Sequence, residues 1–91
     1  MADLFIVKYD ADMQNLLDMH IDGTFITVNI LLSDKNDFEG GGTYFADGTS
    51  CFLNQGDMLF HSGLIKHSGL PITKGKRYLL VAFTNITLNN E

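Results

Sequence analysis

The sequence contains few of the residues that define several common protein classes. Its 91 residues include no tryptophan, one proline and a single cysteine, Cys51. One cysteine excludes an intrachain disulfide, so a disulfide framework cannot hold this fold. No run of about 18 apolar residues occurs either, and a membrane-spanning helix is therefore not expected.

Basic residues are also scarce. Six Lys and Arg stand against eleven Asp and Glu, which gives a formal net charge of -5 at pH 7. Nucleic-acid binding usually requires a basic patch, so we do not expect a nucleic acid as a partner. Because no apolar run is long enough to span a membrane, we do not expect a membrane as a partner either. Three of the basic residues, Lys74, Lys76 and Arg77, lie close together in the sequence. They suffice for one small anionic ligand.

The first residues, Met1 to Leu4, lack the positive segment and the long apolar run of a signal peptide. A single cysteine is typical of a reducing compartment. We therefore expect a cytoplasmic location.

Length and apolar content favour a compact globule. Ninety-one residues suit one domain over residues 1–91, and an apolar content of 45% suits a packed core. A domain this small buries a modest share of its surface, so a bound metal or a partner subunit would add stability.

Short runs of β-branched and aromatic residues, separated by turn residues, predict strands. Turn residues occur at 34–37, 40–42, 47–48, 54–57 and 74–76. Residues 11–19 suit either a helix or a turn followed by a strand, and we favour a turn at 10–14 with a strand leading into His20. The other predicted strands are residues 4–9, 23–32, 43–45, 50–53, 58–61 and 78–87.

With a further short strand near His67, the count reaches about eight. Eight short antiparallel strands without long helices predict an all-β fold, a jelly roll made of two sheets. Residues 88–91 are expected to fray.

The segment His20-Ile21-Asp22 carries the strongest chemical signal. Residues i and i+2 of a strand project from the same face, so an imidazole and a carboxylate lie side by side. One further imidazole would complete the facial triad of non-haem Fe(II) oxygenases, which leaves metal positions open. Taken alone, the pair is more simply a hydrogen-bonded contact at a strand end.

Two histidines, His61 and His67, compete for the third place, and Ser-Gly follows both. Arg77 lies ten residues after His67. Its guanidinium is suited to a forked pair with a carboxylate. A ligand with one metal-chelating end and one distal carboxylate would use both residues, which favours His67.

In this order, His20-Ile21-Asp22, His67 and Arg77 resemble the motif of the Fe(II)/2-oxoglutarate dioxygenases of the prolyl/lysyl hydroxylase type. The likeness is strongest to the C-terminal catalytic domain of procollagen lysyl hydroxylases. It rests also on residues 5–9, 14, 27–30, 38–42 and 69–78.

The resemblance implies a double-stranded β-helix with one Fe(II) bound by His20, Asp22 and His67. It implies that Arg77 binds the distal carboxylate of 2-oxoglutarate and that His61 is not a ligand. It further implies contacts from Tyr9 to that carboxylate and from Asn29 to the pocket, although Tyr9 also suits a core aromatic.

The implied activity is hydroxylation of a peptidyl lysine, or else a peptidyl proline, with O2 consumed and succinate and CO2 released. Ascorbate is a further expected cofactor, and a peptide or protein is the expected substrate. Catalytic domains of this family are about twice as long and carry N-terminal helices and longer substrate loops. Two alternatives stay open, namely a non-catalytic metal-binding module and a cupin-like enzyme that works without 2-oxoglutarate.

Two strands are apolar on both of their faces. Residues 25–32 have only Thr27 and Asn29 as polar breaks, and residues 78–83 have none. Such strands are usually buried on both sides, and an exposed apolar patch marks an interaction site. We therefore expect a homodimer.

Overall fold

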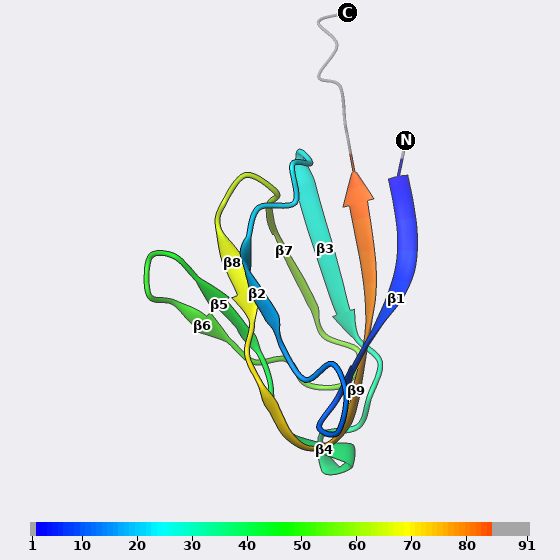
Figure 1. The fold of residues 1–91 in the computed structure, drawn as a ribbon. Helices are drawn as coiled ribbons and strands as arrows, with labels where there is room; N and C mark the ends of the chain where they lie inside the picture. The colour runs from blue at the N-terminus through cyan, green and yellow to red at the C-terminus, as the bar shows by residue number, and fades with distance from the viewer. Residues whose placement is uncertain (1, 85–91) are drawn as a thin grey trace, which may run out of the picture.

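In the computed structural model, residues 2–84 are described. They form nine strands and one short 3-10 helix (Figure 1). The strands are β1 (Ala2–Asp10), β2 (Leu17–His20), β3 (Ile26–Leu31), β4 (Phe38–Gly40), β5 (Thr43–Phe45), β6 (Ser50–Cys51), β7 (Met58–Ser62), β8 (His67–Gly69) and β9 (Ile72–Thr84), and the helix is η1 (Lys35–Asp37).

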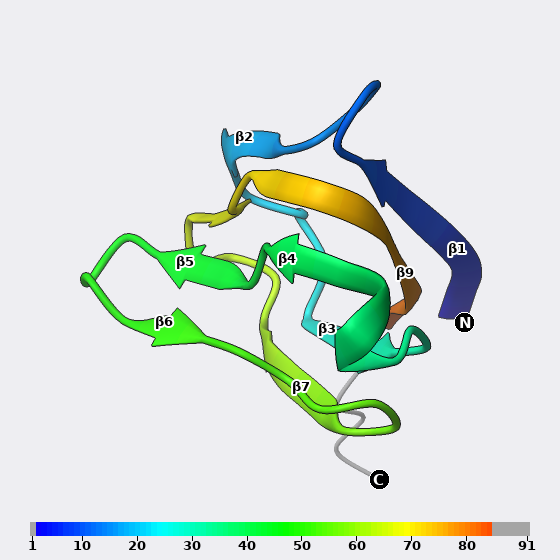
Figure 2. The ribbon, with the colours of Figure 1, turned by 90° about the horizontal axis from the view of Figure 1, so that it is seen from below.

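Two antiparallel sheets make up the molecule. The larger has the strand order β1-β9-β3-β7, with β4 pairing beside one end of β9, and the smaller has the order β2-β8-β5-β6. The sheets lie apart at one end and come together at the other, near β4 (Figures 1 and 2). This arrangement confirms the predicted jelly roll. No helix within residues 2–84 has the length and apolar character needed to cross a membrane.

Alternation along β3 explains how polar residues reach the interior. Thr27, Asn29 and Leu31 are buried, whereas the residues between them are only half-buried. Since successive side chains of a strand point to opposite faces, these three face the smaller sheet. Leu31 joins the hydrophobic core, which also contains Tyr9, Ile72, Leu79 and Val81. Thr27 and Asn29 are left as polar groups on the inner wall.

The expected turn at residues 74–76 is wrong, because β9 continues through it. Gly75 has a φ of 79° and lies within the strand. A Cβ there would collide with the backbone carbonyl of Asp37, so the glycine permits the close approach of β4. The residues read as a turn therefore form a bend between two pairings of one long strand.

Smaller differences concern strand ends. The turn after β1 and the strand leading into His20 are confirmed. The predicted strands at 23–32 and 50–53 are shorter, since β3 begins at Ile26 and β6 ends at Cys51. Strand β4 was not predicted. The end of the last predicted strand and the expected fraying of residues 88–91 lie outside the described residues.

Candidate metal centre

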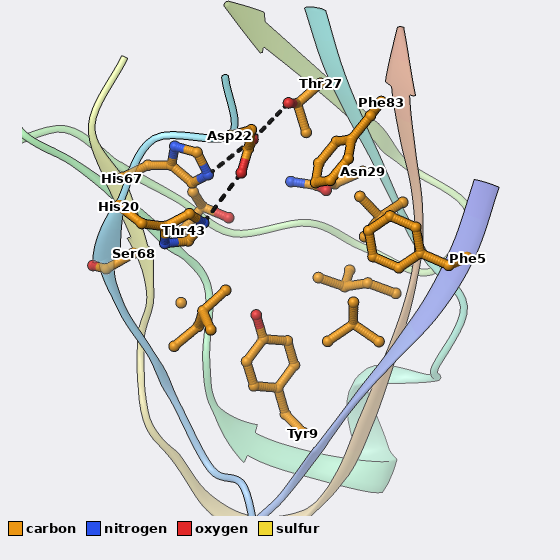
Figure 3. Close-up of a pocket in the computed structure, with 15 residues that line it drawn as sticks. Phe5, Tyr9, His20, Asp22, Thr27, Asn29, Thr43, His67, Ser68 and Phe83 are labelled. Carbon is orange, nitrogen blue, oxygen red and sulfur yellow. Dashed lines mark hydrogen bonds and ion pairs between the residues drawn. The ribbon is translucent and has the colours of Figure 1, made fainter. Parts of the chain in front are cut away.

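Three elements bring His20, Asp22 and His67 together at the open end of the sheets. His20 ends β2 and is paired with His67, the first residue of β8. Asp22 was expected on the same strand as His20, but β2 ends at His20 and Asp22 lies in the loop toward β3, where its backbone N–H donates to the carbonyl of Gly63 at 2.9 Å. Ligand atoms of the three side chains all lie within 4.8 Å of one another (Figure 3).

The carboxylate of Asp22 lies between the two imidazoles. His20 Nε2 is 3.2 Å from Asp22 Oδ1, and His67 Nε2 is 3.2 Å from Asp22 Oδ2. The side chains of Asp22 and His67 are 4% and 7% exposed, whereas that of His20 is 31% exposed. The cluster therefore faces solvent through His20.

Backbone contacts fix which nitrogen of each ring carries a proton. His20 Nδ1 lies 2.6 Å from the carbonyl oxygen of Asp18, and His67 Nδ1 lies 2.8 Å from that of Ile65. A carbonyl oxygen only accepts, so both Nδ1 atoms must donate. In the neutral rings, the lone pairs of both Nε2 atoms then face the carboxylate.

The two Nε2 lone pairs and the negatively charged carboxylate of Asp22 repel one another unless a cation lies among them. Backbone-anchored Nδ1–H groups with free Nε2 atoms are the usual arrangement for metal-binding histidines. Two imidazoles and one carboxylate are also the donor set of a facial Fe(II) site. The residues therefore fit a divalent metal ion.

A cavity of about 80 Å³ adjoins this cluster. Its far wall is apolar and includes Phe5 and Phe83, whose rings meet edge to face at 5.0 Å. Tyr9 and Asn29 also line the cavity, and Figure 3 shows the Tyr9 hydroxyl directed along it. The predicted pocket residues Tyr9 and Asn29 thus share one cavity with the triad.

Arg77 lines a neighbouring cavity instead, of about 170 Å³. Its guanidinium carbon lies 5.1 Å from the centroid of the Tyr9 ring, so a residue of one cavity contacts a residue of the other. Burial raises the pKa of the Tyr9 hydroxyl, and the nearby Arg77 charge partly opposes that rise. The sequence had indicated one pocket for His67 and Arg77, and the structure places them in two adjoining ones.

Arg77 is a buried cation. It is 4% exposed, and its Nη1 has no hydrogen-bond partner among residues 2–84. Burial lowers the pKa of Arg77, but a guanidinium stays protonated at neutral pH. A desolvated charge is costly unless it is paired. Arg77 is therefore well suited to an anionic ligand.

His61 lies beside this cluster without joining it. Its ring centroid is 4.5 Å from that of His67 and 5.1 Å from that of Phe45. Its Nδ1 donates to the carbonyl of Ser62 at 2.8 Å, and burial lowers the pKa of the ring. The group of metal-competent atoms contains His67 and not His61.

Two threonines near the cluster were not predicted to have a role. Thr27 donates from Oγ1 to Asp22 Oδ2 at 2.5 Å, and Thr24 contacts Thr27. Alternation along β3 was the only available signal that Thr27 faces inward. Its contact with Asp22 depends on the curvature of the loop between them.

Solved structures share this fold at low sequence identity. A 2OG-Fe(II) oxygenase family oxidoreductase from Burkholderia pseudomallei matches 92% of this chain and 47% of its own, with a TM-score of 0.72 and 21% identity. A cupin-2 domain protein from Shewanella frigidimarina matches 89% of this chain and 68% of its own, with a TM-score of 0.66 and 15% identity. These likenesses define the class as a cupin-like jelly roll.

Sequence comparison gives the family. The model of the 2OG-Fe(II) oxygenase superfamily matches residues 2–86, and the chain belongs to that superfamily. The multifunctional procollagen lysine hydroxylase and glycosyltransferase of Rattus norvegicus is 38% identical over 86 residues. The procollagen lysyl hydroxylase and glycosyltransferase of Acanthamoeba polyphaga mimivirus is 40% identical over 86 residues.

Both matches cover 89% of this chain. The chain spans only 12% of the length of the rat protein and 10% of that of the viral one. The family likeness therefore concerns one part of these much longer relatives.

Proposed function

We propose that this chain is the catalytic core of an Fe(II)- and 2-oxoglutarate-dependent dioxygenase, with His20, Asp22 and His67 as the iron ligands. The observation that carries the proposal is the orientation of the two imidazoles. Both Nδ1 atoms donate to backbone carbonyls, which turns both Nε2 atoms toward one carboxylate. Membership of the superfamily supports the choice of iron and 2-oxoglutarate.

The reaction would convert 2-oxoglutarate, O2 and a substrate C–H bond into succinate, CO2 and a hydroxylated carbon. Bound Fe(II) would supply the redox chemistry, and the protein would supply binding, orientation and exclusion of water. Three ligands from one side leave open positions for the co-substrates. Ascorbate is an additional expected cofactor.

Tyr9, Asn29 and Arg77 would bind the co-substrate. The Tyr9 hydroxyl and the Asn29 amide lie on the wall of the triad cavity and offer polar contacts within it. The buried charge of Arg77, in contact with the Tyr9 ring, would attract the distal carboxylate. Phe5 and Phe83 would keep the opposite wall free of water.

A peptidyl lysine is the proposed substrate, with a peptidyl proline as the alternative. The relatives from rat and mimivirus are both named for lysine hydroxylation of procollagen. Residues 1–91 would act as one domain, and a reducing, cytoplasmic compartment stays the expected location.

Two other functions remain to be tested against this one. A non-catalytic metal-binding module would bind the ion without turnover. A cupin-like enzyme would use the metal without 2-oxoglutarate, and one observation favours it, namely that Arg77 lines a separate cavity. Succinate formation distinguishes both from the dioxygenase.

The test is succinate release from 2-oxoglutarate, measured by NMR with and without Fe(II) and O2. Slow release without a prime substrate is expected, and it should require both additions. Asp22→Asn should reduce it to background, while Asp18→Asn, an exposed acid on β2, should not. Succinate formation that is absent in the wild type, or unchanged in Asp22→Asn, would contradict the proposal.

A further inference from the structure

The hydroxyl of Thr27 is fixed on one oxygen of the Asp22 carboxylate. Thr27 lies on the inner face of β3, is 2% exposed, and its Oγ1 lies 2.5 Å from Asp22 Oδ2. An ionised carboxylate only accepts, so the Thr27 hydroxyl must donate its single proton there. The contact is a charge-assisted hydrogen bond in a buried setting, which is the stronger kind.

A second hydroxyl contacts that of Thr27. Thr24 Oγ1 lies 3.2 Å from Thr27 Oγ1, and both groups are buried. Since the proton of Thr27 is already used, Thr24 must be the donor in this contact. The result is a directed series from Thr24 to Thr27 to Asp22, in which each hydrogen bond strengthens the next.

Gly63 has no side chain and therefore leaves room for Thr24, the first residue of this hydrogen-bonded series. A Cβ at Gly63 would collide with the carbonyl and the hydroxyl oxygen of Thr24. The carbonyl of Gly63 also accepts from the backbone N–H groups of Asp22 and Gly23, at 2.9 and 3.1 Å. The loop that carries Asp22 is thus held by the turn after β7 on one side and by the threonines on the other.

We propose that Thr27 is a positioning residue that makes Asp22 a one-oxygen metal ligand. Each carboxylate oxygen lies 3.2 Å from a histidine Nε2, so these distances alone do not select the ligating atom. The Thr27 hydroxyl takes one of the two lone pairs of Oδ2, whereas Oδ1 accepts no hydrogen bond from it and keeps both lone pairs for the ion. The inference rests on the proposed metal site.

This selection matters for the number of open metal positions. A six-coordinate ion with three protein ligand atoms keeps about three positions, and a carboxylate that binds through both oxygens removes one of them. The chelating end of 2-oxoglutarate would take two, which would leave one. Thr27 would therefore keep one position of the ion open when the co-substrate is bound.

The test counts the exchangeable waters on Mn(II) bound to the full chain, from water-proton relaxation. Wild type should retain about three waters and lose two of them when 2-oxoglutarate is added. Thr27→Val keeps the shape without the hydroxyl and should retain one water fewer. Thr27→Ser keeps the hydroxyl and should restore the wild-type count.

The test can still be made if Thr27→Val fails to fold. Thr27→Ala also removes the hydroxyl, and it replaces Thr27→Val if that variant unfolds. The thermal midpoint of each metal-free variant serves as the structural readout. Equal water counts in wild type and in a folded variant without the hydroxyl would overturn this inference alone. Failure of the wild type to bind Mn(II) or Fe(II) would overturn the proposed function with it.

Discussion

Tyr9 and Arg77 are cross-strand partners on β1 and β9, and the Arg77 guanidinium carbon lies 5.1 Å from the centroid of the Tyr9 ring. Tyr9 lines the cavity of the metal cluster, whereas Arg77 lines the adjoining one. Each cavity is therefore lined by one member of this contacting pair, a phenol in the first and a buried cation in the second.

Arg77 should determine affinity for 2-oxoglutarate without determining affinity for iron. Arg77→Lys keeps the charge but loses the forked geometry. Charge-assisted hydrogen bonds contribute about 1.5–3 kcal/mol, so we expect 2-oxoglutarate to bind roughly 10-fold to 100-fold more weakly. Anaerobic calorimetry with Fe(II), and then with 2-oxoglutarate, measures both affinities.

The control for this change is Lys74→Ala, because Lys74 is exposed and pairs only loosely with Glu39. It should bind both ligands like the wild type. Equal affinity of Arg77→Ala and wild type for 2-oxoglutarate would refute the assignment of Arg77.

The lack of a side chain at Gly41 should be needed for 2-oxoglutarate binding, because the Arg77 side chain lies against Gly41. A Cβ at Gly41 would be 3.1 Å from Arg77 Cδ and 2.7 Å from Ile72 Cδ1, and its φ is 82°. Gly48 has a φ of 94°, but a Cβ there meets nothing within 4 Å. An alanine at either site costs roughly 1 kcal/mol or more of stability through backbone strain.

Only Gly41→Ala should also weaken 2-oxoglutarate binding, because only that change displaces Arg77. Urea unfolding measures the shared loss of stability, and calorimetry measures the difference in affinity. Indistinguishable 2-oxoglutarate affinities in Gly41→Ala and Gly48→Ala would show that the space at Gly41 has no such role.

Local geometry explains why part of the site was predictable. His20 and Asp22 are two residues apart, so their proximity follows from the chain itself, and the spacing from His67 to Arg77 favoured His67 over His61. The contact from Thr27 to Asp22 depends on the path of the loop between β2 and β3, which brings Asp22 beside β3. Nothing in the local sequence pattern specifies that path. Strand β4 was missed for a related reason, since its pairing beside Gly75 requires a bend that was read as a turn.

The two neighbouring histidines should differ sharply in metal binding. His67→Ala removes an Nε2 atom from the cluster. Loss of a group that only supports a metal ligand weakens metal affinity by about 10-fold to 100-fold, so loss of a ligand itself should weaken Fe(II) affinity by more than about 100-fold. His61→Ala removes only a packing neighbour and should leave affinity nearly unchanged. Anaerobic titration of both variants gives the comparison, and loss of binding in His61→Ala with retention in His67→Ala would reverse the assignment.

The outer face of the larger sheet predicts a homodimer. Two cross-strand rows of apolar residues cover it, Leu4–Ala82–Val28–Phe60 and Ile6–Leu80–Ile30–Met58. Several of these side chains are well exposed, among them Leu4 and Phe60 at 67% each. Such a patch is most simply covered by a second copy through a two-fold axis.

Sedimentation velocity at micromolar concentration measures the association. Ile6→Lys should shift the protein toward monomer, because it places a charge within the patch. Leu64→Lys should not, since Leu64 is comparably exposed but lies in the loop after β7. A wild type that sediments as a monomer, with unfolding independent of concentration, would contradict the homodimer.

The most direct measurement of the central claim is an anaerobic titration of the protein with Fe(II) and 2-oxoglutarate, followed by visible absorption. Chelation of Fe(II) by the 2-oxo acid gives a charge-transfer band. The band should require both additions, saturate at one equivalent of each per chain, and be lost in Asp22→Asn. An Fe(II)-loaded protein whose spectrum does not change when 2-oxoglutarate is added would contradict the account.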